Sequence, residues 1–109
     1  MGNGDDNIMK ILPENNEERK DIKIYSGVIK YFPRALCAVA IRSAEGSKQL
    51  HPHEPMHWDR DKSPDELDSL MRHMLDGDWE AVAWRALANL EKKLEDKIEE
   101  ERENNGTQF

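Results

Sequence analysis

Two stretches of apolar residues at helical spacing, separated only by Asp76, Gly77 and Asp78, constrain this chain more than any other feature. In both stretches an apolar residue recurs at every third or fourth position. The first comprises Leu67, Leu70, Met71, Met74 and Leu75, and the second comprises Trp79, Val82, Ala83, Ala86, Leu87, Leu90, Leu94 and Ile98. This pattern predicts two successive helices, the first closed by Gly77 and the second capped by Asp78 and ending near Glu99.

The beginning of the first of these helices has a strong local signal. Ser63-Pro64-Asp65-Glu66 has the pattern of a capping box, in which the Ser63 hydroxyl accepts a hydrogen bond from the backbone N–H of Glu66. The Glu66 carboxylate in turn accepts one from the backbone N–H of Ser63, and Pro64 suits the first helical position. We therefore predict a helix from Ser63 to Gly77.

A third helix is predicted upstream, beginning at Pro33, because the missing N–H of proline costs nothing in a first helical turn. Residues 24–32 carry mixed signals and are expected to lead into it. Gly46 is expected to end this helix, followed by a loop from Ser47 to Lys62 that holds three histidines and Trp58. Loops of this length without secondary structure of their own are often functional.

The high proportion of charged residues limits how much of the chain can enter a core. Of 109 residues, 36% are Asp, Glu, Lys or Arg, and the formal net charge is -7. We predict a flexible arm over residues 1–23, a helical domain over 24–99 and a disordered tail over 100–109. The expected fold class is all-α with three main helices. Because three short helices bury little surface alone, we expect a homo-oligomer to complete the fold.

The same composition excludes several classes of function. An acidic chain lacks the clustered cations of a protein that grips the DNA backbone, although it can hold a mononucleotide through a metal ion. The single cysteine, Cys37, excludes an internal disulfide and is expected to be a buried, inert thiol. With no signal peptide and no apolar run of about 20 residues, the chain is expected to be a cytoplasmic protein without membrane contact.

Carboxylates and histidines are the candidate functional residues. Asp65 and Asp68 lie three residues apart, which places them on one helix face, where paired carboxylates can hold Mg2+ or Mn2+. In the alternative interpretation, Asp65 only interacts favourably with the helix dipole at the helix N-terminus, and Asp68 only forms a surface ion pair with Arg72. Both interpretations stay open.

The loop segment from His51 to His57 combines three histidines with Glu54, which suggests zinc or nickel. Its two prolines stiffen the backbone and its spacing is neither helical nor that of a zinc finger, so we expect no metal there. His57 and Trp58 form a possible platform for stacking a base, while Trp58 also fits a hydrophobic anchor for the loop. His73 flanks an apolar stripe and is expected to be structural.

Several of these residues stand in an order that resembles a known family. The segments that carry it are Lys30-Tyr31-Phe32-Pro33, Pro55-Met56-His57-Trp58, Lys62-Ser63, Leu70-Met71-Arg72-His73 and Ala83-Trp84-Arg85-Ala86-Leu87-Ala88. The chain resembles the dATP/dGTP diphosphohydrolase N-terminal domain family of phages and prophages, which is related to MazG-like all-α nucleotide pyrophosphohydrolases. The resemblance covers about residues 26–91.

This resemblance implies a helical, oligomeric enzyme that cleaves a purine deoxynucleoside triphosphate to the monophosphate and pyrophosphate with Mg2+ or Mn2+. It assigns catalysis and metal binding to Asp65, Asp68 and Glu45. It assigns substrate binding to Lys48, His57, Trp58, Arg72 and His73. In this mechanism the carboxylates hold metal ions that neutralise the phosphates and activate a water molecule.

The chain departs from the family pattern at three places. Lys48 stands where the family has an acidic residue, Arg34 stands where relatives often have Asp, and the segment Asp76–Glu80 is short and lacks a histidine. These changes support an alternative function, a catalytically inactive phage protein on the same scaffold. Such a protein would bind a nucleotide or inhibit a host protein by docking its acidic surface on a basic one.

Overall fold

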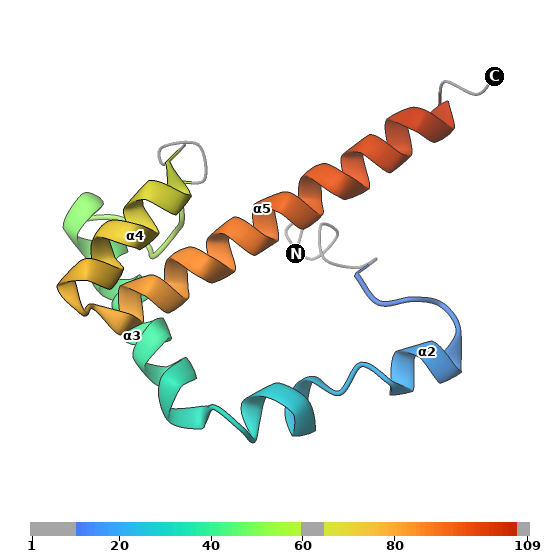
Figure 1. Ribbon diagram of the computed structural model, residues 1–109, viewed down its shortest axis with the longest axis horizontal. Helices are drawn as coiled ribbons and strands as arrows, with labels where there is room; N and C mark the ends of the chain where they lie inside the picture. Colours follow the sequence, from blue (N-terminus) through green and yellow to red (C-terminus); the bar gives the residue numbers. More distant parts are fainter. Residues whose placement is uncertain (1–10, 60–64, 107–109) are drawn as a thin grey trace. The chain divides into compact units, whose positions relative to one another are not determined.

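The computed structural model describes residues 11–59 and 65–106, with side chains as far as Glu103 (Figure 1). All regular secondary structure in these residues is helical, which confirms the predicted all-α class. The chain divides into two compact units, with the boundary in sequence between Pro33 and Arg34.

Within the described residues no single helix is long and apolar enough to cross a membrane. The segments 16–29 and 33–50 reach the required length and composition only as a pair, which is bent by 84°.

The first unit contains a short helix and one π-helical turn. The helix, α2 (Asn16–Lys20), is capped by the Asn15 side chain, which accepts a hydrogen bond from the backbone N–H of Glu18 at 3.1 Å. It lies within the segment 1–23 that was predicted to be an arm. The π-helical turn, η1 (Tyr25–Ile29), shows that the mixed signals of residues 24–32 resolve into helix and not into an extended segment.

The second unit begins with α3 (Pro33–Leu50), which starts at the predicted proline. The predicted end at Gly46 is wrong, because the helix continues for four more residues and the loop begins at His51. A glycine inside a helix costs only about 1 kcal/mol relative to alanine. The buried Ser47 side chain offsets this cost by accepting a hydrogen bond from the backbone N–H of His57 at 3.1 Å.

The helix α4 (Glu66–Asp76) ends as predicted at Gly77, whose φ of 72° is left-handed and suits glycine. Its beginning differs from the prediction. Asp65 is the N-cap residue, and Ser63 and Pro64 lie outside the described residues. The Glu66 carboxylate is bound by side chains of the next helix, and the predicted capping box involves Ser63, which lies outside the described part of the chain.

The helix α5 (Trp79–Gly106) begins after Asp78, as predicted, and Asp78 Oδ1 accepts a hydrogen bond from the backbone N–H of Ala81 at 3.4 Å. It continues through residues 100–106, which corrects both the predicted end near Glu99 and the predicted disordered tail. Glutamate, lysine and arginine have a high intrinsic helix propensity, so α5 continues beyond the end of its apolar stripe.

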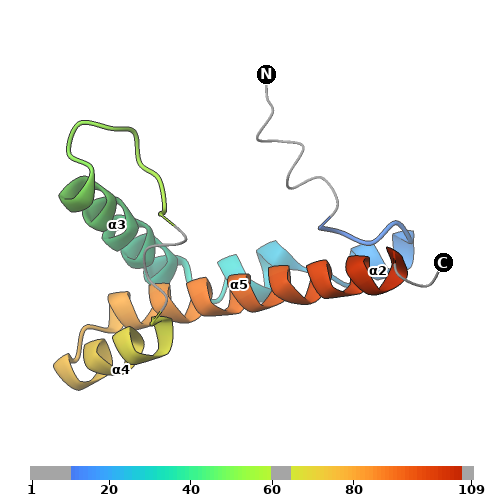
Figure 2. The ribbon, with the colours of Figure 1, turned by 90° about the horizontal axis from the view of Figure 1, so that it is seen from above.

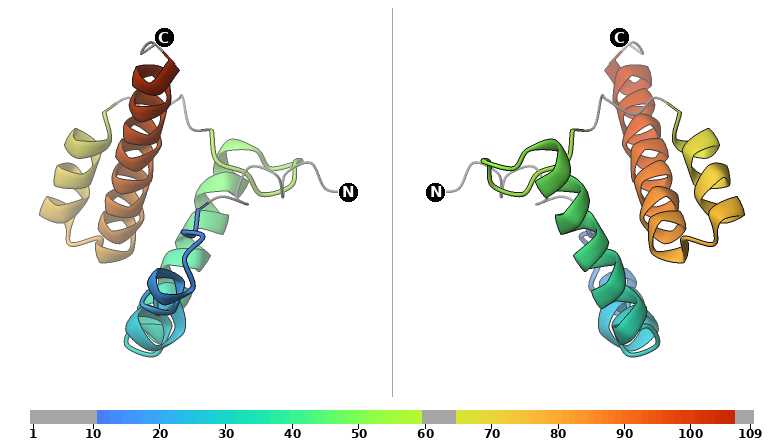
Figure 3. Two further views of the ribbon diagram at one scale, coloured as in Figure 1. Left: turned by 90° about the vertical axis from the view of Figure 1, so that its right-hand side faces the viewer. Right: turned by 90° about the vertical axis from the view of Figure 1, so that its left-hand side faces the viewer.

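The helices α4 and α5 form an antiparallel pair whose members lie side by side in both views of Figure 3. The α5 face that packs here holds Ala81, Arg85, Ala88 and Lys92, at a spacing of three or four residues. It lies roughly opposite the predicted apolar stripe of α5, whose leucines stay about half exposed. The large apolar residues of α5 therefore do not form the contact with α4.

Cys37 is exposed on α3, and the expectation of a buried thiol is wrong. Its neighbours in sequence are apolar, but α3 packs only one of its faces, and the side chain of Cys37 falls on the other. The buried apolar residues of the described chain are Leu70, Ala81 and Ala88, so the core is small.

Candidate functional site

A pocket of about 290 Å³ opens between α3, the loop 51–59 and the beginning of α5. Figure 2 shows this loop leaving the end of α3 and turning back along that helix. The pocket is lined by cationic, aromatic and small polar side chains, among them Arg42, Ser47, His51, His57, Trp58, Asp59, His73, Trp84 and Arg85. Pockets with aromatic walls and a few converging polar groups are the usual form of small-molecule sites.

Two tryptophans form one wall of the pocket. Trp58 of the loop meets Trp84 of α5 edge to face, with ring centroids 5.3 Å apart and planes at 79°. Lys92 Nζ lies 5.6 Å from the Trp58 ring centroid, and the Arg85 guanidinium carbon lies 5.4 Å from that of Trp84. The loop is therefore anchored through Trp58, as one of the two interpretations of this residue expected.

Two arginines bring positive charge to the pocket, and each is held by a carboxylate. Arg42 donates to Asp78 at 3.2 Å, and Arg85 donates to Glu66 at 2.9 Å. His73 Nδ1 lies 3.7 Å from the same Asp78 carboxylate. A guanidinium has five N–H donors. In the described part of the chain each of these arginines donates one hydrogen bond to a carboxylate, so further N–H groups can bind an anion.

Glu66 is the buried charge that ties α4 to α5. Only 5% of the residue is exposed, and its two carboxylate oxygens accept from Arg85 and from Lys92 Nζ, each at 2.9 Å. Burial by itself would raise the pKa of Glu66, but the hydrogen bonds from Lys92 and Arg85 outweigh it and hold the pKa below its ordinary value. This carboxylate therefore stays ionised and fixes the orientation of Arg85 beside the pocket.

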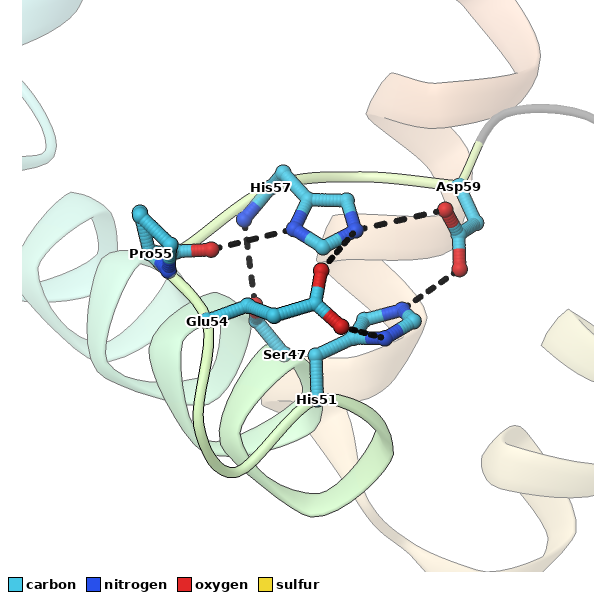
Figure 4. A network of polar contacts seen from close by, with 6 residues as sticks. All are labelled: Ser47, His51, Glu54, Pro55, His57 and Asp59. Carbon is cyan, nitrogen blue, oxygen red and sulfur yellow. Dashed lines mark hydrogen bonds and ion pairs between the residues drawn. The ribbon is translucent and has the colours of Figure 1, made fainter.

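A second polar network lies at the rim of the pocket, in the loop (Figure 4). His51 Nε2 lies 2.5 Å from Asp59 Oδ2, and His51 Nδ1 lies 3.6 Å from Glu54 Oε2. His57 Nε2 lies 3.4 Å from Asp59 Oδ1 and 3.9 Å from Glu54 Oε1. The two imidazole rings face each other with centroids 4.2 Å apart.

The backbone of the loop orients His57. Its Nδ1 lies 3.0 Å from the carbonyl oxygen of Pro55, which accepts its proton. This hydrogen bond to Pro55, together with the nearby carboxylates of Asp59 and Glu54, raises the pKa of His57 against the opposing effect of burial. The ring is thus held with its Nε2 toward the two carboxylates.

The structure brings together three of the five residues that the family resemblance assigns to substrate binding. His57, Trp58 and His73 line the pocket, whereas Lys48 and Arg72 do not. The Arg72 side chain is 66% exposed and donates to Asp65 at 3.0 Å, a hydrogen bond that lowers the pKa of Asp65.

The expected metal ligands Glu45, Asp65 and Asp68 are not brought together. Among the described residues, the group of side chains close enough to share one metal ion consists of His51, Glu54 and His57. The surface ion pair of Arg72 is formed with Asp65 and not, as the sequence interpretation expected, with Asp68. The carboxylates that the resemblance assigns to Mg2+ or Mn2+ therefore do not form a group that fits one shared ion in the described part of the chain.

Sequence reasoning missed Arg42, Arg85 and Glu66 as members of the site. Glu66 carried a usable signal, because it stands four residues before Leu70 and so shares the buried face of α4. Arg85 and Lys92 stand seven residues apart on α5, again on one face. Arg42 carried no such signal, since its partner Asp78 lies 36 residues away.

Searches of family models, curated proteins and solved structures found no match to this chain. The resemblance to the diphosphohydrolase family therefore stays a prediction.

Proposed function

We propose that this protein binds a purine deoxynucleoside triphosphate in the pocket between α3, the loop and α5, without hydrolysing it. The observation that carries the proposal is the convergence of Trp58, Trp84 and two arginines on one pocket of about 290 Å³. This is the alternative that the departures from the family pattern favoured. A cytoplasmic location, where such nucleotides occur, is part of the same proposal.

The two halves of a nucleotide match two parts of the lining. A base stacks on an indole face with a gain of about 1–3 kcal/mol, and Trp58 and Trp84 offer two indoles. Phosphate oxygens accept charge-assisted hydrogen bonds from guanidinium groups, and Arg42 and Arg85 are already positioned by their carboxylates. This mode of phosphate binding needs no metal-bound carboxylates.

Titration of intrinsic tryptophan fluorescence with dGTP, dATP, dCTP and pyrophosphate tests the proposal. We expect saturable binding of dGTP or dATP, and Arg42→Gln should weaken it about tenfold, since a hydrogen bond to a charged group contributes about 1.5–3 kcal/mol. Lys93→Gln, which removes an exposed charge of α5 outside the pocket, is the control and should bind like the wild type.

Two results would change this conclusion. Equal loss of binding in Arg72→Gln would place the ligand on the α4 surface that the family resemblance indicates. Failure of every nucleotide to bind would leave the other alternative, inhibition of a host protein.

Hydrolysis is measured in the same samples as pyrophosphate release with Mg2+ or Mn2+. We expect no release from dGTP or dATP beyond that of Asp68→Ala, because Glu45, Asp65 and Asp68 do not form a shared metal site. Release by the wild type alone would restore the metal-dependent diphosphohydrolase.

We further propose that the protein forms a homo-oligomer through α5. Four large apolar side chains along one face of this helix stay about half exposed: Leu87, Leu90, Leu94 and Ile98. Their spacing of three, four and four residues is that of a helix that packs on another helix, and a second copy presents the same stripe.

Light scattering after size-exclusion chromatography tests the oligomer. We expect the wild type to run as an oligomer and Leu94→Lys to run as a monomer, since a buried lysine opposes association. Asp96→Lys introduces the same side chain on the opposite face of α5 and should leave the oligomer intact. A monomeric wild type would contradict the proposal.

A further inference from the structure

The polar network at the pocket rim has the geometry of a metal site. His51, Glu54 and His57 each offer one ligand atom, and these atoms all lie within 4.8 Å of one another. Two ligands of a tetrahedral zinc ion, at bond lengths near 2.0–2.1 Å, lie about 3.3 Å apart. His51 Nδ1 lies 3.6 Å from Glu54 Oε2 and His57 Nε2 lies 3.9 Å from Glu54 Oε1, so each carboxylate oxygen faces one imidazole nitrogen at a distance slightly longer than this value.

The hydrogen bonds around the two histidines select the nitrogens that would bind an ion. His57 Nδ1 donates to the Pro55 carbonyl, which leaves the lone pair on Nε2. His51 Nε2 lies against the Asp59 carboxylate, which leaves the lone pair on Nδ1. Both remaining nitrogens lie within 4 Å of Glu54. Histidines that bind metals characteristically donate their other N–H to a carboxylate or a backbone carbonyl.

The donor set selects the kind of ion. Two imidazole nitrogens and one carboxylate oxygen suit zinc and its neighbours, whereas Mg2+ prefers a shell of oxygen atoms. A water molecule would occupy the fourth position of a tetrahedral ion, and Asp59 Oδ1 lies 3.4 Å from His57 Nε2.

The prolines of the loop contribute to this arrangement. Their stiffening of the backbone was one reason to expect no metal, beside a ligand spacing that is neither helical nor that of a zinc finger. In the folded loop, Pro52 and Pro55 restrict the backbone between His51 and His57, and Pro55 accepts the hydrogen bond from the His57 ring. Because the prolines restrict the loop before an ion binds, less conformational entropy is lost when the ligands converge on the ion.

We propose that His51, Glu54 and His57 form a binding site for one zinc ion, which joins the loop to the C-terminal end of α3. His51 directly follows the last residue of α3, and the other two ligands lie within the next six residues. The ion would close this short segment on itself and hold Trp58, the next residue, against α5. The site does not require a bound nucleotide, although two of its ligands, His51 and His57, also line the pocket.

The test is a titration of the full-length protein, first stripped with EDTA, with zinc chloride against a chromophoric chelator. We expect one zinc ion per chain, and Glu54→Gln should weaken its binding about a hundredfold, because removal of a ligand has at least the effect of removing its supporting partner. His53→Gln removes an exposed histidine of the same loop and should leave zinc affinity unchanged. Magnesium chloride should not compete.

Folding and nucleotide binding are followed separately. Circular dichroism should show unchanged helix content in Glu54→Gln, and zinc should raise the melting temperature of the wild type but not of this variant. Glu54 does not line the pocket, so the variant should still bind dGTP if the proposed function is correct. The zinc site is overturned by an absence of zinc binding, by equal weakening in His53→Gln, or by equal competition from magnesium.

Discussion

Replacing Glu66 by glutamine is expected to lower the free energy of unfolding by about 2–3 kcal/mol. The variant keeps the shape of the side chain but removes the negative charge between Arg85 and Lys92, both hydrogen-bonded to it at 2.9 Å. Removal of one partner from a buried ion pair leaves the other charge desolvated and unpaired. The effect stays at the lower end of the known range because Arg85 and Lys92 are about one-quarter exposed and regain water.

Urea denaturation followed by circular dichroism measures this loss. Asp68→Asn is the matched control, because it removes a carboxylate from the same helical turn of α4 where the side chain is exposed. It should cost less than about 0.5 kcal/mol. A similar loss of unfolding free energy in both variants would show that stability depends on negative charge near the N-terminus of α4 and not on the buried ion pair.

The pH dependence of the same pair gives a second readout. The pKa of Glu66 in the folded protein lies below its ordinary value of 4.5, so its stabilisation is complete above pH 4.5 and is lost as the pH falls through the folded pKa. The difference in unfolding free energy between wild type and Glu66→Gln should therefore narrow on acidification below pH 4.5. A difference that stays constant through this range would contradict the ion pair.

Replacing Trp84 by alanine is expected to cost about 2 kcal/mol of unfolding free energy and to release the loop 51–59 from α5. The Trp84 ring packs against Trp58 at 5.3 Å and lies beside the Arg85 guanidinium. Trp84 is half-buried, so the loss is smaller than for a tryptophan enclosed in a core. Chemical denaturation gives the free energy, and a red shift of the remaining tryptophan emission reports exposure of Trp58.

Trp79→Ala is the control for this substitution. Trp79 begins the same helix and is 60% exposed, so its removal should cost less than about 1 kcal/mol and leave the loop in place. If Trp84→Ala were no more destabilising than Trp79→Ala, the contact between the two indoles would not anchor the loop.

The parts of the fold that depend on local signals could be predicted from the sequence. Pro33 and Asp78 mark helix beginnings and Gly77 marks a helix end, because each acts through its own backbone or its nearest neighbours. The packing of α5 could not be predicted in this way. Periodicity assigns large apolar residues to the buried face. Here the small side chains of Ala81 and Ala88 allow close approach of α4, and Glu66 of α4 neutralises the cations on the same face of α5.

The site shows the same division. His57 and Trp58 were identifiable because they are adjacent in a loop of unusual composition. The pairing of Arg42 with Asp78 joins α3 to the residue that precedes α5, and no spacing rule connects the two positions. The cluster of His51, Glu54 and His57 depends on the loop conformation. No regular secondary structure brings residues at this spacing together in a loop, so only the folded loop shows that their ligand atoms are close.

The unequal lengths of α4 and α5 have a consequence for local unfolding. At 1.5 Å per residue, the 11 residues of α4 span about 16 Å, and the 28 residues of α5 span about 42 Å. Lys92 bonds to Glu66, the first residue of α4, so the turns of α5 beyond Lys92 extend past the beginning of α4 and gain little from it. Amide protons should therefore exchange slowly between residues 81 and 92 and progressively faster toward residue 106. In a single copy, one continuous helix thus contains both well-protected and poorly protected backbone.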